Sequence, residues 1–419
     1  MKGFRLATLL CGLISPTFAG DIADIIKSGD IWEKTYKELS GREFSDVSYD
    51  RIDADTIRIS RDSGIRLAEL DFGETVITWK PDNGTTQSVV IMVYNKGDDF
   101  PIDRDAYMKI LKETIGALNE MMMTKGKARQ AAKKDTGVSL KTWIWENENT
   151  FLRLDASYSG SKKHFASEFI RLKIGQDKDS VVGGGADDSV KRNDLKSKVQ
   201  RDEESGDVWL SLPMIDQGDK GYCVPATVAR VFAYYGMTGV DQHALAQLCD
   251  SSGEGGTMIA DMQVALESIS RKFHIRLQLL EGKDITSVFM DYIADYNKAA
   301  KRLRKTQATP MDWIEVCRDK QVLLAARGNK RYVKKWFAPI KKSIDAGVPI
   351  LWSVELGIFP EEDGDQPDGG HMRLIVGYNE ENGTIFYSDS WGEGHEKKTM
   401  KMNFAAAMTR YRYILRPSR

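Results

Sequence analysis

The pattern of apolar and polar positions differs between the two halves of the chain. From about residue 22 to 178, short apolar or alternating runs are rich in branched and aromatic side chains, which is typical of strands. These runs lie at 56–59, 76–79, 88–94, 142–145, 151–154 and 169–172. One helix is predicted near 103–125, where apolar residues recur at helical spacing. The first half is therefore expected to be an antiparallel sheet packed on a helix, an α+β domain.

The second half begins after a stretch of different composition. Residues 179–206 are polar, glycine-rich and of mixed charge, so they bury too little apolar surface to order themselves. We expect an exposed linker there, between an N-terminal domain (21–178) and a C-terminal domain (207–419). Within the second domain, helical periodicity predicts helices at 223–235, 242–249 and 258–271 and a helical insertion at about 286–345. The apolar run 349–354 predicts a buried strand.

The first twenty residues have the pattern of a signal peptide. Lys2 and Arg5 precede the apolar run 6–14, and Thr17-Phe18-Ala19 has the small-x-small form of a cleavage site. A membrane anchor is the alternative, but the run is shorter than the roughly 20 apolar residues that a span requires. Lipid attachment at Cys11 is disfavoured because residues 8–10 lack the small side chain that such processing needs. We expect export to the periplasm or the extracellular space.

Composition limits the kinds of partner. About 400 residues remain after cleavage, enough for two or three domains. Lys plus Arg number 60 against 61 for Asp plus Glu, so no overall basic field indicates nucleic acid. Three cysteines are left, Cys223, Cys249 and Cys317. With an odd number, one is unpaired unless the protein dimerises, and a free thiol in an oxidising compartment indicates reactivity.

Cys223 stands where a glycine-punctuated loop, 216–222, enters an apolar helix. Pro225 suits the first turn of that helix and Gly236 its end. The partial positive charge at a helix N-terminus favours thiolate over thiol, and thiolate is the nucleophilic form. Six positions earlier, the amide of Gln217 can join the Cys223 backbone N–H in holding an oxyanion. Cys223 is thus the candidate nucleophile, and Cys249 and Cys317 either pair or are small buried hydrophobes.

The Gln-x5-Cys spacing at a loop-to-helix junction resembles the papain-like cysteine peptidases. The opening Cys-Val-Pro-Ala-Thr is closer to their double-glycine, bacteriocin-processing branch. Residues 370–378, with His371, resemble the strand that carries the family's base, and Asp389-Ser390-Trp391-Gly392 resembles its Asn-Ser-Trp-Gly. The resemblance covers about 207–419 and implies a helical lobe with the nucleophile helix and an antiparallel sheet lobe with His and Asp. It implies a peptide or protein substrate. The sequence has no Gly-x-Ser-x-Gly, His-Glu-x-x-His, Cys-x-x-Cys or Gly-x4-Gly-Lys-Ser/Thr motif, so we expect neither metal nor cofactor.

His371 and Asp389 must meet across a hairpin for this set to assemble. The Asn382-Gly383 pair predicts a tight two-residue turn, which would shift the register by five positions away from a direct His371–Asp389 pair. The predicted site therefore requires a longer connection over about 379–383, or a bulge. His395 is a possible second base, but Gly392 and Gly394 around it predict a loop.

Other functions remain open on the same residues. An acyl transfer to amines, of the transglutaminase type, uses the same Cys-His-Asp set, and a peptidase scaffold can also serve as a non-catalytic binding module. The first domain is either an inhibitory propeptide or an accessory domain, although papain-like propeptides are usually helical and this one reads as strands. The oligomeric state is not indicated.

Two charged segments have alternative interpretations. The basic run 298–305 is either a solvated helix face or a surface for anionic polymers or membrane headgroups. The acidic loop 360–368 before His371 is either solvated or selects basic substrate residues. In both segments we favour the solvated reading.

Overall fold

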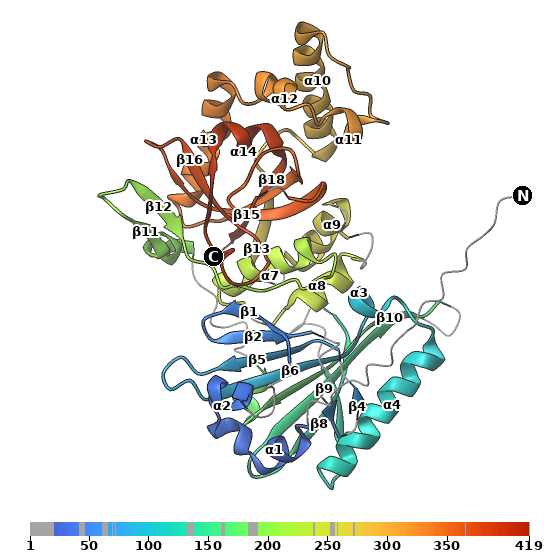
Figure 1. Ribbon diagram of the computed structural model, residues 1–419. Helices are drawn as coiled ribbons and strands as arrows, with labels where there is room; N and C mark the ends of the chain where they lie inside the picture. Colours follow the sequence, from blue (N-terminus) through green and yellow to red (C-terminus); the bar gives the residue numbers. More distant parts are fainter. Residues whose placement is uncertain are drawn as a thin grey trace, which may run out of the picture.

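The computed structural model of the chain is a mixed α+β protein with two large antiparallel sheets (Figure 1). It describes residues 21–41, 47–60, 66–68, 70–71, 73–131, 138–160, 164–182, 192–237, 239–251, 256–257, 259–270, 273–364 and 366–418. Residues 1–20, the predicted signal peptide, lie outside this range. Within it, no helix is both long and apolar enough to cross a membrane.

The first half is built on an eight-stranded sheet with the order β1-β2-β5-β6-β10-β9-β8-β7, paired antiparallel throughout. Its strands are β1 (Tyr49–Asp53), β2 (Thr56–Ile59), β5 (Thr75–Trp79), β6 (Thr86–Asn95), β7 (Lys127–Ala131), β8 (Leu140–Glu146), β9 (Phe151–Ser159) and β10 (Ala166–Gly175). A separate two-stranded ribbon joins β3 (Arg66–Leu67) and β4 (Leu70–Asp71). The predicted strands all fall within this set.

In the described part of the first half, the sheet is accompanied by the helices α1 (Ala23–Ser28), α2 (Tyr36–Gly41), α3 (Lys96–Asp99), α4 (Arg104–Met121) and α6 (Lys178–Val182), together with a 3-10 helix at Asp30–Glu33. The long predicted helix is α4, which begins after Asp103 because that side chain accepts from the Ala106 N–H. The buried Tyr107 hydroxyl donates to backbone carbonyls of β9 and β10, so α4 is fixed across the sheet.

The second half contains another antiparallel sheet, with the order β11-β12-β15-β14-β18-β13, and with β16 and β17 added beside β15. Its strands are β11 (Val199–Arg201), β12 (Asp207–Leu210), β13 (Ile275–Leu279), β14 (Ile350–Leu356), β15 (Gly369–Asn379), β16 (Thr384–Ser388), β17 (Lys398–Lys401) and β18 (Thr409–Pro417). Every residue of β14 is buried, as the continuous apolar run predicted.

Helices cover this sheet and extend beyond it (Figure 1). They are α7 (Cys223–Tyr234), α8 (Gln242–Leu248), α9 (Ile259–Ser270), α10 (Ile285–Leu303), α11 (Trp313–Val316), α12 (Lys320–Ala326), α13 (Lys330–Ile344) and α14 (Met402–Met408). In Figure 1, α7 and α8 lie where the two halves meet, and α10 to α12 form the end of the molecule farthest from the first sheet.

The prediction of an exposed linker over 179–206 is wrong for its second part. A 3-10 helix spans Arg192–Lys198, and Leu195 within it is fully buried. The hairpin β11–β12 then pairs with β15, so residues 199–210 belong to the second sheet. Composition misses this arrangement because β11 pairs locally with β12, and β12 is fixed by β15, which lies more than 160 residues downstream. Residues 183–191 lie outside the described residues.

The two halves share a buried apolar contact. Met92, Val138, Leu140 and Phe169 of the first half are buried in the same hydrophobic cluster as the side chains of α7 and α8. The first half therefore packs directly against the helix that begins at Cys223.

Candidate active site

Cys223 is the first residue of α7, and its side chain is partly buried. Its position at the start of an apolar helix is the one predicted from the sequence. Further along α7, the buried Arg230 donates to the Asp389 carbonyl and to Ser388 Oγ, both at 2.6 Å. One helix thus carries the cysteine and holds the segment that contains Asp389.

His371 lies on β15, whose hairpin with β16 has a register between the two predicted alternatives. Asn379 pairs with Thr384, so the connection consists of residues 380–383 and is longer than a tight two-residue turn. A bulge between Ile375 and Gly377 shifts the register further. Together the longer connection and the bulge bring the end of β16 to the level of His371.

The structure brings three of the predicted residues together. His371 Nε2 lies 2.9 Å from Asp389 Oδ1, and the His371 ring and the Cys223 thiol interact, so that each shifts the pKa of the other. Because Asp389 occupies Nε2, the nitrogen left for Cys223 is Nδ1. Trp391 stacks on the His371 ring, with centroids 4.7 Å apart and an interplanar angle of 24°. The indole covers one face of the imidazole and limits the access of water to it.

The electrostatics of the three residues are coupled. Burial would lower the pKa of His371, but hydrogen bonds to Asp389 and Cys223 and their charges outweigh burial and raise it to about 9. Burial would raise the pKa of the Cys223 thiol, but the hydrogen bond and charge of His371 bring it below its ordinary value. Burial also opposes ionisation of Asp389, whereas Arg373 and His371 keep its pKa low. The directions of these shifts favour thiolate beside imidazolium over thiol beside neutral imidazole.

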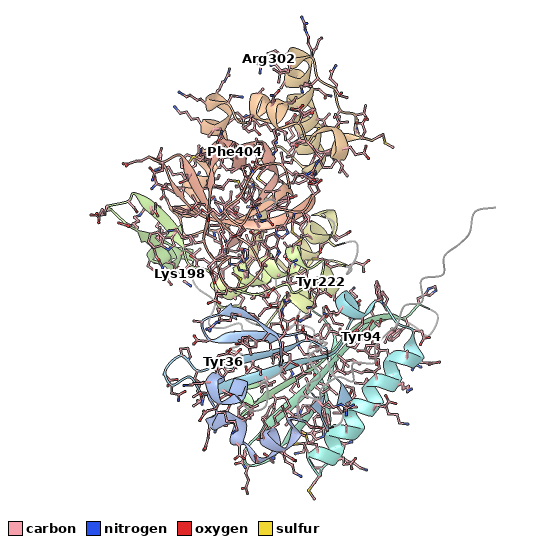
Figure 2. The ribbon with its side chains drawn as sticks, in the orientation of Figure 1. Tyr36, Tyr94, Lys198, Tyr222, Arg302 and Phe404 are labelled. Carbon is pink, nitrogen blue, oxygen red and sulfur yellow. The ribbon has the colours of Figure 1, made fainter. Side chains whose placement is uncertain are left out.

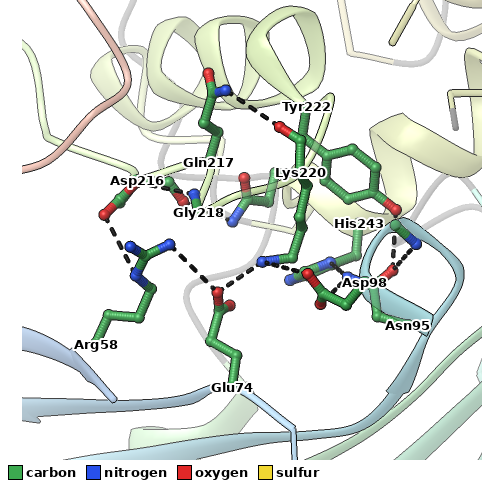
Figure 3. Close-up of polar contacts among 12 residues, drawn as sticks. Arg58, Glu74, Asn95, Asp98, Asp216, Gln217, Gly218, Lys220, Tyr222 and His243 are labelled. Atoms are coloured by element: carbon green, nitrogen blue, oxygen red, sulfur yellow. Dashed lines mark hydrogen bonds and ion pairs between the residues drawn. The ribbon is translucent and has the colours of Figure 1, made fainter. Parts of the chain in front are cut away.

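Gln217, the fourth predicted residue, lies in the loop that leads to Cys223 (Figure 3). Its Nε2 donates to the Lys220 carbonyl at 3.2 Å, and its backbone N–H donates to the Ser390 carbonyl at 2.9 Å. An amide nitrogen carries two hydrogens, so one N–H is left after the bond to Lys220. The bond to Ser390 connects the loop before Cys223 to the residue after Asp389.

Comparison with known proteins agrees with this geometry. Residues 209–417, about half of the chain, match the model of the Peptidase_C39 like family. This region belongs to the papain-like cysteine peptidase superfamily. No curated protein matches the sequence of the chain. The first half has no counterpart in the family match, which begins at residue 209.

The peptidase region contains two further residues that the sequence analysis missed. Arg373 is fully buried, and its Nε donates to Asp389 Oδ1 at 2.8 Å. Its two terminal nitrogens donate to the Glu361 carboxylate at 2.9 and 2.7 Å. Arg373 is two positions after His371 on one strand, so strand alternation places both side chains on the same face. The two-residue spacing from His371 was the sequence signal that could have identified Arg373.

Glu361 is the exception in the acidic loop, where Glu362, Asp363, Pro367 and Asp368 are exposed as expected. The loop was expected to be solvated, with selection of basic substrate residues as the alternative. The Glu361 side chain is 1% exposed, and it accepts from Arg373 and from the Tyr387 hydroxyl at 2.9 Å. It therefore neutralises a buried arginine and faces neither solvent nor substrate.

The remaining cysteines and His395 lie outside this cluster. Cys249 and Cys317 are buried free thiols, and burial raises the pKa of each to about 12. The sequence left open a pair or separate buried thiols, and the structure shows the second. His395 packs edge-on against Trp391, and its carbonyl accepts from the Asp389 N–H at 3.1 Å. It supports the Asp389 segment through its backbone.

Proposed function

We propose that the chain is an exported cysteine peptidase that hydrolyses peptide bonds in a peptide or protein substrate. The observation that carries the proposal is the position of His371, which bonds to Asp389 through Nε2 and interacts with the Cys223 thiol. The family match of the same region supports it. Export rests on the pattern of residues 1–20.

In this reaction the Cys223 thiolate attacks the scissile carbonyl carbon, and the electron pair moves onto the carbonyl oxygen. The Cys223 backbone N–H and the remaining N–H of Gln217 stabilise that oxyanion. His371 then gives its Nδ1 proton to the leaving amine as the C–N bond breaks, which leaves a thioester on Cys223. Water, deprotonated by His371, hydrolyses the thioester and restores the thiol.

Asp389 and Arg373 act through His371 in this proposal. The Asp389 carboxylate stabilises the imidazolium and orients the ring so that Nδ1 faces sulfur. Arg373 keeps Asp389 ionised and holds it in place, and Glu361 balances the charge of Arg373. In this proposal residues 21–178 form a second domain. The connection between the two domains is about residues 183–191, shorter than the linker predicted over 179–206.

Incubation of the purified protein, followed by sequencing of any new N-terminus, tests the proposal. Wild-type protein is expected to cleave peptides from an unstructured library, and any new N-terminus in the protein itself should be absent from Cys223→Ala. Cys223→Ala is expected to lose at least about 10⁴-fold in rate, as removal of a catalytic nucleophile does. Cys249→Ala is the matched control, because its buried thiol has a pKa near 12 and should leave the rate unchanged.

Two outcomes would contradict the proposal that the chain is a peptidase. If Cys223→Ala cleaves as fast as wild type, cleavage comes from another source. If Cys223 is alkylated rapidly by iodoacetamide at neutral pH but transfers acyl groups only to added amines, the transglutaminase alternative replaces hydrolysis.

A further inference from the structure

The first half of the chain reaches the loop that precedes Cys223 through buried charges. Lys220 Nζ lies 2.6 Å from Glu74 Oε2 and 3.4 Å from Asp98 Oδ1, and the Lys220 side chain is 1% exposed. Arg58 reaches into the same loop, with Nε 3.5 Å from Asp216 Oδ2. Figure 3 shows these side chains of the first sheet converging on the loop from below.

Gly218 shows how closely these charged groups approach. It has a φ of +69°, and a Cβ there would lie 2.4 Å from Arg58 Nη1, 2.7 Å from Lys220 Nζ and 2.9 Å from Glu74 Oε2. Glycine at 218 suits this backbone angle, and a Cβ there would displace the ends of the side chains that form these ion pairs.

A second contact fixes the other side of the site. The Glu393 N–H donates to the Arg51 carbonyl at 2.9 Å, and a Cβ on Gly392 would lie 2.7 Å from that same oxygen. Gly392 follows Trp391, the residue that covers His371. The first half therefore holds both the loop before Cys223 and the segment after Asp389.

Lys220 links this contact to Gln217. Its ammonium is held by Glu74, while its backbone carbonyl accepts from Gln217 Nε2. A carbonyl accepts but cannot donate, so this bond also decides which end of the Gln217 amide is nitrogen. When Glu74 holds Lys220 in place, it holds the acceptor that orients the amide.

We infer that the first half is a permanent part of the active site, and that Glu74 and Lys220 are positioning residues that orient Gln217 toward the oxyanion. The inference rests on the proposed function, because the oxyanion exists only if Cys223 attacks a carbonyl. It excludes the reading of residues 21–178 as a propeptide whose release activates the enzyme. Neither residue touches substrate, and both act through Gln217.

Two probes of Cys223 separate orientation of Gln217 from a general loss of structure. A peptide aldehyde adds to the Cys223 sulfur and forms an oxyanion that needs Gln217, whereas iodoacetamide alkylates the same sulfur without one. In Glu74→Gln, which removes the charge that holds Lys220, we expect the affinity for the aldehyde and kcat/KM to fall about tenfold. The alkylation rate and its pH profile should stay within twofold of wild type.

Glu168→Gln is the matched control. Glu168 is a buried carboxylate 2.7 Å from the Lys96 ammonium, like Glu74 beside Lys220, but it makes no ion pair with the loop before Cys223 in the described part of the chain. It should lower thermal stability without changing the ratio of aldehyde affinity to alkylation rate. Glu74→Asp, which keeps the charge, should recover part of the loss.

The inference is overturned if Glu74→Gln lowers stability but leaves the aldehyde affinity as in wild type, or if a chain cut in the segment 183–191 and freed of residues 21–178 gains activity. Failure of the proposed function looks different. In that case wild-type Cys223 is alkylated, but no peptide is hydrolysed, while the aldehyde still reports on Gln217. Hydrogen exchange of residues 216–222, faster in Glu74→Gln than in Glu168→Gln, gives a readout that needs no substrate.

A separate observation concerns the far end of the molecule. Residues 285–344, from α10 to α13, contain 14 Lys and Arg against 5 Asp and Glu, a net charge of +9 in a chain of net −1. The rest of the chain therefore carries −10. Helix α13 contains six basic residues and no acidic one. Such a separation of charge orients a protein toward an anionic surface.

Exposed apolar side chains occur in the same part of the chain, with Met311 and Ile314 next to Asp312 and Glu315 in sequence. Met311 is 94% and Ile314 55% exposed, and Leu303 lies between the exposed Arg302 and Arg304. Figure 2 places Arg302 at the outer tip of the molecule. We call residues 298–315 the basic tip. Cations alone suit any polyanion, but exposed aliphatic side chains beside them suit a lipid bilayer, where they enter the acyl boundary.

The geometry points to the basic tip as a docking surface for an anionic phospholipid bilayer. Co-sedimentation of the full chain with phosphatidylcholine vesicles, with and without phosphatidylglycerol, tests it. Binding is expected only with phosphatidylglycerol and should weaken as salt rises from about 0.05 to about 0.5 M. Arg302→Glu with Arg304→Glu should reduce binding more than tenfold, and Met311→Ser with Ile314→Ser several-fold at every salt concentration.

Lys109→Glu with Lys112→Glu, on the exposed face of α4 in the first half, is the charge-matched control and should bind like wild type. Equal loss in this control, or no loss on changing Met311 and Ile314, would overturn the docking surface. Tight binding to double-stranded DNA without binding to the vesicles would assign the charge to nucleic acid instead.

Discussion

Two buried histidines stand in similar surroundings and have opposite protonation. His371 and His243 each lie close to an aspartate and an aromatic ring, with a buried arginine near that aspartate. Burial and interaction partners raise the pKa of His371 to about 9, whereas burial lowers that of His243 to about 3. Burial disfavours the imidazolium in both. At His371 the hydrogen bonds and charges of Asp389 and Cys223 outweigh burial, whereas at His243 the charges of Arg171, Lys220 and Lys173 add to the effect of burial and oppose that of Asp241.

His371 donates from Nε2 directly to a carboxylate, which favours the charged ring. His243 meets the amide of Asn95, with Nδ2 3.4 Å from Nδ1. The Oδ1 of Asn95 accepts from the Gly97 backbone N–H, so its nitrogen must face the ring and donate to it. A protonated imidazole cannot accept that bond, and Asp241 acts on His243 through its charge alone. A direct bond to carboxylate, more than proximity to one, separates a base from a structural histidine.

Replacement of each histidine is the largest test of this comparison. His371→Gln should lower kcat/KM by about 10³-fold or more, because it removes both the proton carrier and the group that holds the Cys223 thiolate. His243→Gln keeps an acceptor for Asn95 and should change kcat/KM less than threefold. Both are measured with the same peptide substrate. Similar losses in the two variants would contradict the separation of roles.

Asp389→Asn should lower kcat/KM less than His371→Gln does, but it should also shift the pH dependence of kcat/KM. The hydrogen bond and charge of Asp389 raise the pKa of His371, so loss of the charge lowers it. As pH rises, activity that depends on a protonated His371 is then lost at a lower pH than in wild type. The alkaline limb of the kcat/KM profile should therefore move from about 9 toward 6.5. At the optimum we expect about tenfold lower activity, the value of one charge-assisted hydrogen bond.

Asp241→Asn is the control for that shift. Asp241 lies beside His243 and caps α8, and asparagine is also a good cap. The alkaline limb should stay where it is in wild type. If Asp389→Asn leaves the limb unmoved, the proton whose loss ends activity does not belong to His371.

Local sequence patterns predicted the residues of the site better than the buried residues that hold them in place. Cys223 at a helix start and the motifs around His371 and Asp389 depend on neighbours within a few positions, and the structure places these three side chains together. Arg373 was missed although strand alternation puts it beside His371. Glu361 was missed because an acidic loop reads as solvated until its buried partner is known.

Contacts between the halves were beyond any local pattern. Glu74 and Lys220 are 146 residues apart, and nothing near either one identifies its partner. The pairing of residues 207–209 with 377–379 likewise joins β12 to β15, and through β12 it adds residues 199–201 of the predicted linker to the sheet. Both depend on where distant segments meet, which hydrophobic periodicity does not encode.

The smallest expected effect is on stability, where the two histidines act at opposite ends of the pH range. The folded pKa of His371 lies above its ordinary 6.5, so its contribution is fully present below about 6.5 and is lost as pH rises through about 9. The folded pKa of His243 lies below 6.5, so the unfolded chain binds a proton there that the folded chain excludes. Its effect is a loss of stability as pH falls from about 6.5 toward 3.

Calorimetric melting from pH 5 to 9.5 should therefore show a shallower alkaline decline in His371→Gln and a shallower acid decline in His243→Gln. The slopes of melting temperature against pH decide the comparison, since either replacement also lowers the melting temperature through lost packing. Unchanged slopes in both variants would mean that other groups set the pH dependence.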